Sequence, residues 1–218
     1  MNDNSMFDQN IILEDDYVAL SPMEQRHVDA LHEAGKYSEI WRWTTSQYCY
    51  THDSTSAWVS ECIEKRMNKS QYPFVIYDKV SKAIVGSSSY LNISAKHKVI
   101  EIGYTFLTPS AQKSFVNRRC KFLLLSYAFD VLNVNRVAFQ TSEKNTCSRK
   151  AILGLGAVFE GINRHCRVLE NGDLRSSAVY SVISDEWDDV KQNLKSKLTR
   201  PTLGKDDVYH NQNVLKAH

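Results

Sequence analysis

The pattern between residues 101 and 161 constrains the fold of this chain more than any other feature of its sequence. Apolar residues alternate on both faces of residues 99–107, which predicts a central strand that ends before Pro109. A polar loop follows, and apolar residues then recur at 3.6-residue spacing, which predicts a long amphipathic helix. The apolar face of this helix consists of Val116, Cys120, Leu123, Leu124, Tyr127, Ala128, Val131 and Leu132. A strand at 136–141 and a short helix at 146–155 complete the segment.

Further patterns place strands and helices on both sides of this segment. Before it, apolar periodicity and turn signals predict three strands and two helices: 17–20, 72–77 and 84–93, and 22–35 and 54–68. After it, two strands flank a turn at Asn171–Asp173, and a last helix starts at Ser184 or Asp185 and ends before Pro201. Strands that alternate with helices predict a mixed α/β sheet with helices on both faces. We expect one domain over residues 1–200 and a polar, flexible tail over 201–218.

Composition and charge exclude several classes of function. The formal net charge is +2 and the basic residues are spread along the 218 residues, which argues against a nucleic-acid partner. The chain lacks a run of about 18 apolar residues and its start lacks a signal-peptide pattern, so we expect a cytoplasmic protein without a membrane partner. The 5 cysteines and 7 histidines show no metal-ligand spacing, so we expect no metal. The sequence leaves the oligomeric state open, a homodimer included.

The order of elements and several motifs resemble the Gcn5-related N-acetyltransferase (GNAT) superfamily, specifically its ribosomal-protein, RimJ/RimL-like branch. The resemblance spans residues 11–198. It rests on these residues: Gln112, Val116, Asn117 and Lys121, then Asn145-x-x-Ser148, Phe-Glu160-Gly, and Glu186-Trp187 after a strand. It implies the GNAT fold, a mostly antiparallel twisted sheet of about seven strands in which the central strands splay apart.

The resemblance implies acetyl-CoA as cosubstrate, with its pyrophosphate bound by backbone N–H groups at the start of the long helix. The binding loop consists of Gln112, Lys113, Ser114, Phe115, Val116 and Asn117. Family members have glycines in this loop, whereas this chain has Lys113, Ser114 and Phe115, so we expect Phe115 to narrow or redirect it. Basic residues gather at the start of the helix: Lys113, Arg118, Arg119 and Lys121. The helix dipole disfavours positive charge there, and a bound polyanion would offset that cost. A solvated basic helix start is the alternative.

The second motif, Asn145-x-x-Ser148, lies at the start of the short helix. The resemblance implies that Asn145 contacts the pantetheine arm and that Ser148 lies near the sulfur of CoA. On the residues alone, Asn145 is equally an N-cap of that helix. Cys147 has no histidine to support a nucleophilic role, so we expect direct acetyl transfer.

Acetyl transfer to an amine needs a base and a donor that polarises the thioester carbonyl. The resemblance implies Glu160 as the base, directly or through a water. Glu101 is the rival, because other superfamily members place a base on that strand, and a strand-end glutamate beside a glycine is the alternative for Glu160. We expect a backbone N–H near Phe106 or Leu107 to polarise the carbonyl.

The leaving thiolate needs a proton, and Ser148 is the candidate donor. Many relatives use a tyrosine on the short helix, which this chain lacks, and Tyr180 is a weaker substitute. Trp41, Trp43 and Tyr48 are candidates for lining an acceptor pocket, with plain packing as the alternative.

We expect the acceptor to be a peptide N-terminus. An α-amine with a pKa near 8 is about a tenth neutral at pH 7, so it needs less help from a base than a lysine does. One alternative is a small amine such as a polyamine, an amino sugar or an antibiotic. The other is a degenerate CoA-binding or sensor module without activity, which the missing glycines suggest.

Overall fold

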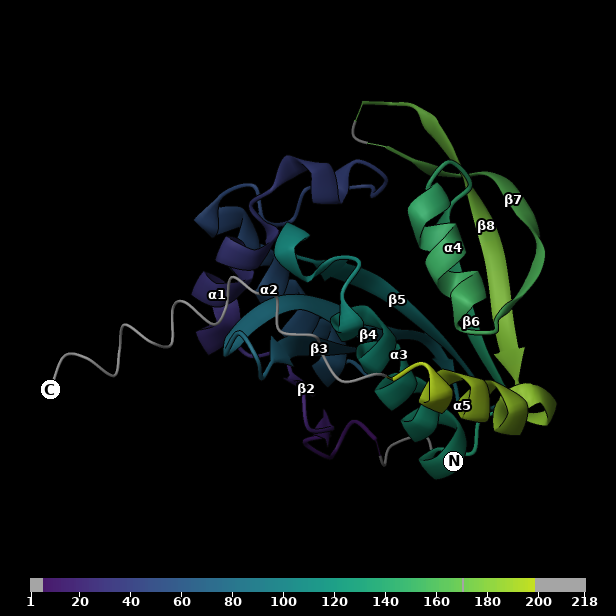
Figure 1. The fold of residues 1–218 in the computed structure, drawn as a ribbon. Helices are drawn as coiled ribbons and strands as arrows, with labels where there is room; N and C mark the ends of the chain where they lie inside the picture. The colour runs from purple at the N-terminus through teal and green to yellow at the C-terminus, as the bar shows by residue number, and fades with distance from the viewer. Residues whose placement is uncertain (1–5, 170, 199–218) are drawn as a thin grey trace, which may run out of the picture.

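The computed structural model describes residues 6–169 and 171–198. These residues form one twisted sheet and the helices that pack on it (Figure 1). The strands are β1 (Leu13–Glu14), β2 (Val18–Pro22), β3 (Gln71–Asp78), β4 (Ala83–Ser94), β5 (Val99–Leu107), β6 (Arg136–Ser142), β7 (Val158–Val168) and β8 (Leu174–Ile183). They form a sheet of 8 strands in the order β1-β2-β3-β4-β5-β6-β8-β7. All neighbours pair antiparallel except β5 and β6, which are parallel. This confirms the mixed, mostly antiparallel α/β sheet, with one strand more than expected.

Helices cover both faces of the sheet. The helices are α1 (Val28–Gly35), α2 (His52–Met67), α3 (Phe115–Ser126), α4 (Thr146–Gly154) and α5 (Trp187–Ser196). Short turns are η1 (Gln25–His27), η2 (Ser38–Trp41), η3 (Pro109–Ala111), η4 (Tyr127–Val131) and η5 (Ser184–Glu186). One buried cluster joins α1 and α2 to Phe106 of β5, and a larger one joins α3, α4 and α5 to most of the strands. The sheet therefore separates two cores, which gives the layers seen in Figure 1.

The long helix predicted to follow the loop is present, but its last turn differs. After α3, the segment η4 is π-helical, and Leu132 N donates to Tyr127 O at 3.0 Å. Val116, Cys120 and Leu124 are buried as expected, whereas Val131 is 58% exposed. The extra residue in the π turn rotates the following side chains, so the 3.6-residue pattern fails there.

The predicted start of the first helix at Pro22 is wrong. Pro22 ends β2, where it pairs with Phe74 of β3, and the helical path starts only with η1. There the backbone N–H of Glu24 donates to Nδ1 of His27 at 3.1 Å, which caps the turn. Strand pairing thus competes successfully with the helix-start signal of the proline. The predicted tail at 201–218 lies outside the described residues.

Candidate active site

The parallel strands β5 and β6 separate soon after they begin. They pair through Val99 with Arg136, Ile100 with Val137 and Glu101 with Ala138, and within the described residues the pairing goes no further. Figure 1 shows the two strands running apart beyond these pairs. Their backbone groups on the facing edges therefore lack strand partners, and such groups can bind an extended ligand.

A bulge in β5 follows this point. Ser87 pairs with Phe106 and Ser89 with Gly103, so Ser88 of β4 lies opposite two residues of β5, Tyr104 and Thr105. Tyr104 has a φ of 46°, an uncommon value for an aromatic residue. Such a bulge bends the strand and increases its local twist, which is consistent with the divergence of β5 from β6.

Glu101 lies where the two strands part. Its side chain is buried, and Oε2 accepts hydrogen bonds from Asn92 Nδ2 at 2.8 Å and Gln140 Nε2 at 3.3 Å. A Cβ at Gly103 would lie 2.8 Å from Leu91 Cδ1 and 3.5 Å from Glu101 Oε1, so the glycine lets Leu91 pack beside the carboxylate. Two amides thus orient the carboxylate beside the opening between the strands.

The loop before α3 keeps a glycine-like backbone without glycine. Lys113 has a φ of 57°, in the left-handed region that glycine favours. Ser114 caps the helix, because its Oγ accepts from Val116 N at 3.2 Å and donates to Ala111 O at 2.6 Å. The first turn of α3 contains no acidic residue. Its N–H groups and the helix dipole therefore suit an anionic ligand such as a pyrophosphate.

Phe115 packs toward the N-terminal strands. Its half-buried ring meets Tyr17 edge-on at 6.1 Å between centroids and lies against the larger core. Nearby, Gln112 Nε2 donates to Leu107 O at 3.0 Å and so ties the loop to the end of β5. The ring thus helps to pack the start of α3 against the N-terminal strands.

The start of α4 brings Asn145 and Ser148 together. Asn145 Oδ1 accepts a hydrogen bond from Ser148 N at 3.1 Å, which makes Asn145 the N-cap of the helix. The side chain of Ser148 is half-buried, whereas Cys147 beside it is exposed. Tyr180 is buried on β8, and its hydroxyl accepts from Arg149 Nε at 2.8 Å.

Glu160 lies on the outer strand β7 and is held by two partners. Both its carboxylate oxygens accept from Arg136 at 2.5 Å, and Oε1 also accepts from Ser181 Oγ at 2.9 Å. The hydrogen bond from Arg136 is the main cause that lowers the pKa of Glu160. A lowered pKa weakens a carboxylate as a base, and β8 stands between β7 and β6.

The three aromatic residues named from the sequence take different positions. Trp41 is buried, and its Nε1 donates to Gly35 O at 2.7 Å, so it is a core residue. Trp43 lies under the guanidinium of Arg42, with 5.0 Å from the cation to the ring centroid. Tyr48 stacks on Trp58 at 5.5 Å and meets Tyr104 of the bulge at 6.4 Å. Trp41 also meets β5, through the ring of Phe106 at 4.9 Å, whereas Tyr48 meets the bulge residue Tyr104 itself.

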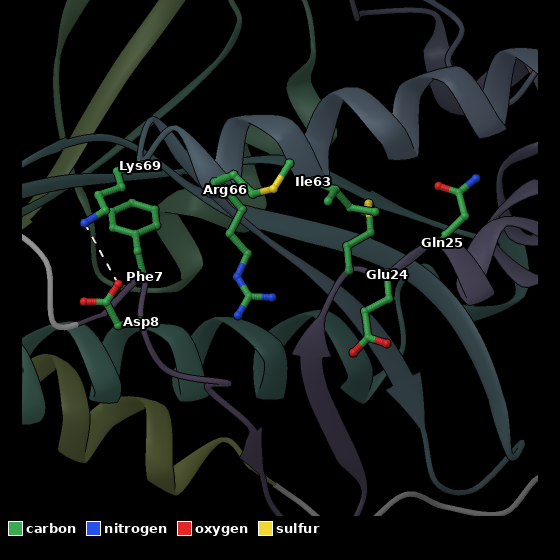
Figure 2. A pocket seen from close by; sticks show the side chains of 9 residues that line it. Phe7, Asp8, Glu24, Gln25, Ile63, Arg66 and Lys69 are labelled. Carbon is green, nitrogen blue, oxygen red and sulfur yellow. Dashed lines mark ion pairs between the residues drawn. The ribbon is translucent and has the colours of Figure 1, made fainter.

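A surface groove of about 550 Å³ lies elsewhere. Figure 2 shows it between α2 and the residues that precede β1, with Asp8 and Lys69 paired at 3.9 Å across one end. Its lining consists of Phe7, Asp8, Met23, Glu24, Gln25, Ile63, Arg66, Met67 and Lys69. It includes no site residue predicted from the sequence. Within the described residues, no helix is long and apolar enough to span a membrane, and no group of three metal-ligating side chains gathers.

Sequence reasoning missed the residues that support the site. Asn92 and Gln140 hold Glu101, and Arg136 holds Glu160. These partners lie 9, 39 and 24 residues apart along the chain, so no local pattern indicates them. Only the strand order brings them together.

The chain belongs to the GNAT acetyltransferases. Residues 18–158, more than half of the chain, match the family model described as "Acetyltransferase (GNAT) domain". The protein is accordingly an acyltransferase of the GNAT type, and this family uses acetyl-CoA as the acetyl donor.

Individual relatives agree with this assignment. A GCN5-related N-acetyltransferase from Brucella melitensis superposes with a TM-score of 0.81 at 28% identity, covering 88% of this chain and 86% of that one. The uncharacterised N-acetyltransferase YoaA of Bacillus subtilis (strain 168) is 21% identical over 79% of this chain and 96% of its own length. YdaF of the same strain, named provisionally as a ribosomal N-acetyltransferase, is 29% identical over 50% of this chain and 58% of its own length.

Proposed function

We propose that the protein transfers the acetyl group of acetyl-CoA directly to a protein N-terminal α-amine, as a member of the RimJ/RimL-like branch. The observation that carries the proposal is the position of Glu101, an oriented carboxylate at the point where β5 and β6 part. The provisional name of YdaF, a ribosomal N-acetyltransferase, supports this branch.

The residues fit acetyl-CoA in three places. The first turn of α3 offers N–H groups to the pyrophosphate, with Lys113 and Ser114 shaping the loop. The unpaired edges of β5 and β6 offer backbone partners to the amides of the pantetheine arm, and Asn145 and Ser148 lie at the end of β6. Acetyl-CoA supplies an acyl group activated as a thioester.

The polarising N–H is best assigned to Leu107. Thr108 N donates to Val85 O of β4 at 2.8 Å. Because successive backbone N–H groups of a strand alternate in direction, the N–H of Leu107 is directed away from β4, toward the opening, and that of Phe106 toward β4. A donor at this position would stabilise the negative charge that develops on the carbonyl oxygen.

Glu101 receives the base role in this proposal. As the amine nitrogen bonds to the carbonyl carbon, the Glu101 carboxylate takes the amine proton, directly or through a water, and the C–S bond breaks. Ser148 donates a proton to the leaving thiolate. Glu160 is the less suitable base because Arg136 neutralises it and lowers its pKa.

The charges around Glu101 favour a monoamine acceptor over a polyamine. Its hydrogen-bond partners are the neutral amides of Asn92 and Gln140, and the carboxylate of Glu160 on β7 is paired with Arg136. A polyamine would require further unpaired carboxylates to neutralise its second charge. The left-handed backbone of Lys113 in turn argues against a degenerate loop.

The test combines calorimetry with acetyl transfer to a panel of acceptors. We expect micromolar binding of acetyl-CoA, and acetylation of peptides with a free N-terminus but not of N-terminally blocked, lysine-containing peptides or polyamines. Glu101→Gln should keep the affinity for acetyl-CoA and lower kcat by about 10²- to 10⁴-fold, the range of general-base catalysis. Glu160→Gln is the matched control and should keep kcat within a few fold.

Three results would contradict the proposal. Absence of acetyl-CoA binding would favour the sensor module, and turnover of polyamines alone would favour the small-amine alternative. A loss of kcat confined to Glu160→Gln would return the base role to Glu160.

A further inference from the structure

A buried lysine on α3 contacts the bulge in β5 from the side of the sheet that α3 covers. Lys121 on α3 is only 6% exposed, and burial lowers the pKa of its ammonium group. None of the ion pairs found within the described residues includes it. A buried cation without a carboxylate partner costs folding free energy, and an apolar side chain of similar length would avoid that cost.

The side-chain hydrogen bonds found for Lys121 within the described residues go to the bulge and to the residue opposite it. Its Nζ donates to Ser88 Oγ at 3.0 Å and to Thr105 Oγ1 at 2.5 Å, and the two hydroxyls are 2.8 Å from each other. Ser88 is the single β4 residue that faces Tyr104 and Thr105. Lys121 therefore joins the two strands where their ladder is irregular and where regular strand pairing does not fix the register.

The register of β5 determines which groups face the opening. Phe106 packs in the core beside α2, and Leu107 packs in the larger core beside α3. A slip by one residue would exchange these faces and turn the N–H of Leu107 toward β4. The strain of the positive φ at Tyr104 would favour such a relaxation.

We propose that Lys121 is a positioning residue that locks the register of β5 and so aims the N–H of Leu107 at the thioester. This inference rests on the proposed use of acetyl-CoA. Lys121 lies on the helix whose first turn would bind the pyrophosphate, so one side chain fixes both parts of the cofactor site relative to each other.

The test compares Lys121→Met, Thr105→Val and the double variant. The control is Cys120→Ala, because Cys120 is a buried neighbour of Lys121 on α3 and has no hydrogen bond to the bulge in the described structure. Amide hydrogen exchange is measured by NMR on the ligand-free proteins. Acetyl-CoA affinity and the KM of the acceptor peptide are measured separately.

If Lys121 locks the register, the backbone amides of residues 102–107 should exchange faster in Lys121→Met, and those of the other strands should not. The Kd for acetyl-CoA should rise about tenfold, the scale of losing a hydrogen bond to a charged group, while the acceptor KM stays unchanged. Thr105→Val should act alike, and the double variant should be no worse than either single one, because both remove the same contact. Thr105→Val removes no buried charge, so it carries the test if Lys121→Met does not fold.

Wild-type exchange and affinity in both single variants would overturn the proposal. Faster exchange across all strands, as in Cys120→Ala, would do the same, because it would indicate a general packing role. If the wild-type protein bound no acetyl-CoA, the proposed function would fail, while the exchange pattern would still decide whether Lys121 locks the register.

Discussion

Arg136 and Glu160 form a two-pronged ion pair that crosses the strand between them. Arg136 starts β6, Glu160 lies on β7, and Ser181 of the intervening β8 donates to the same carboxylate. The pair connects the outer hairpin to the place where β5 and β6 are still joined. Its geometry favours a structural role for Glu160.

The ion pair of Arg136 and Glu160 should make the free energy of unfolding depend on pH in the acidic range. The pKa of Glu160 is lowered from 4.5 in the folded protein, so its contribution is present above that value and is lost as the pH falls through the lower folded value. Glu160→Gln should reduce the free energy of unfolding at pH 7 by about 0.5–1 kcal/mol, given partial exposure. The difference should shrink as the pH falls through the lowered pKa of folded Glu160. Denaturant titrations measure this difference, with Glu39→Gln as the control, because Glu39 is an exposed carboxylate outside the observed ion pairs. A stability difference that persisted in acid would refute the dependence on Glu160.

Substitution of Asn145 should mainly affect stability, and substitution of Ser148 should mainly affect turnover. Asn145→Ala removes the cap of α4 and should lower the free energy of unfolding by about 1 kcal/mol, whereas Asn145→Asp keeps an acceptor oxygen and should not. Ser148→Ala leaves the backbone N–H that Asn145 accepts from, so stability should hold while kcat falls by about 10- to 100-fold. Chemical denaturation and steady-state kinetics distinguish the two, and full turnover in Ser148→Ala would remove it as the proton donor.

Phe115 should matter for folding more than for cofactor binding. Phe115→Ala removes a half-buried ring from its contact with Tyr17 and should lower the free energy of unfolding by about 1–2 kcal/mol. The affinity for acetyl-CoA, measured by calorimetry, should not tighten. An increase of about tenfold or more would mean that the ring obstructs the site, as the loss of the loop glycines predicts.

The cysteines should divide into two reactive and three inert thiols. Burial raises the pKa of Cys49 to about 11, of Cys62 to about 12 and of Cys120 to about 11. Cys147 and Cys166 are exposed, and thiolates are the reactive form. Alkylation followed by mass spectrometry should therefore modify these two first. Acetyl-CoA should protect Cys147, which lies beside Ser148, but not Cys166; equal labelling with and without the ligand would place the ligand elsewhere.

Local patterns predicted the elements whose buried faces repeat along the chain. The apolar face of α3 and the strand β5 follow from periodicity, because each buries side chains at regular intervals. The two-residue strand β1 was missed, since its pairing of Leu13 with Leu20 depends on a neighbour and not on a pattern of its own.

The site was predictable only where single motifs mark it. Asn145 was recognisable as a cap from its residue type. The orientation of Glu101 by Gln140 and the neutralisation of Glu160 by Arg136 depend on the order of distant strands, which no single stretch of sequence encodes.

The early end of pairing between β5 and β6 places two strand edges inside the molecule, facing each other. Exposed edges at the margin of a sheet can recruit strands of other chains and so promote aggregation. Here the two unpaired edges face each other in the middle of the strand order and do not lie at the margin of the sheet. A strand of another chain therefore reaches these two edges less easily than an edge at the margin of the sheet.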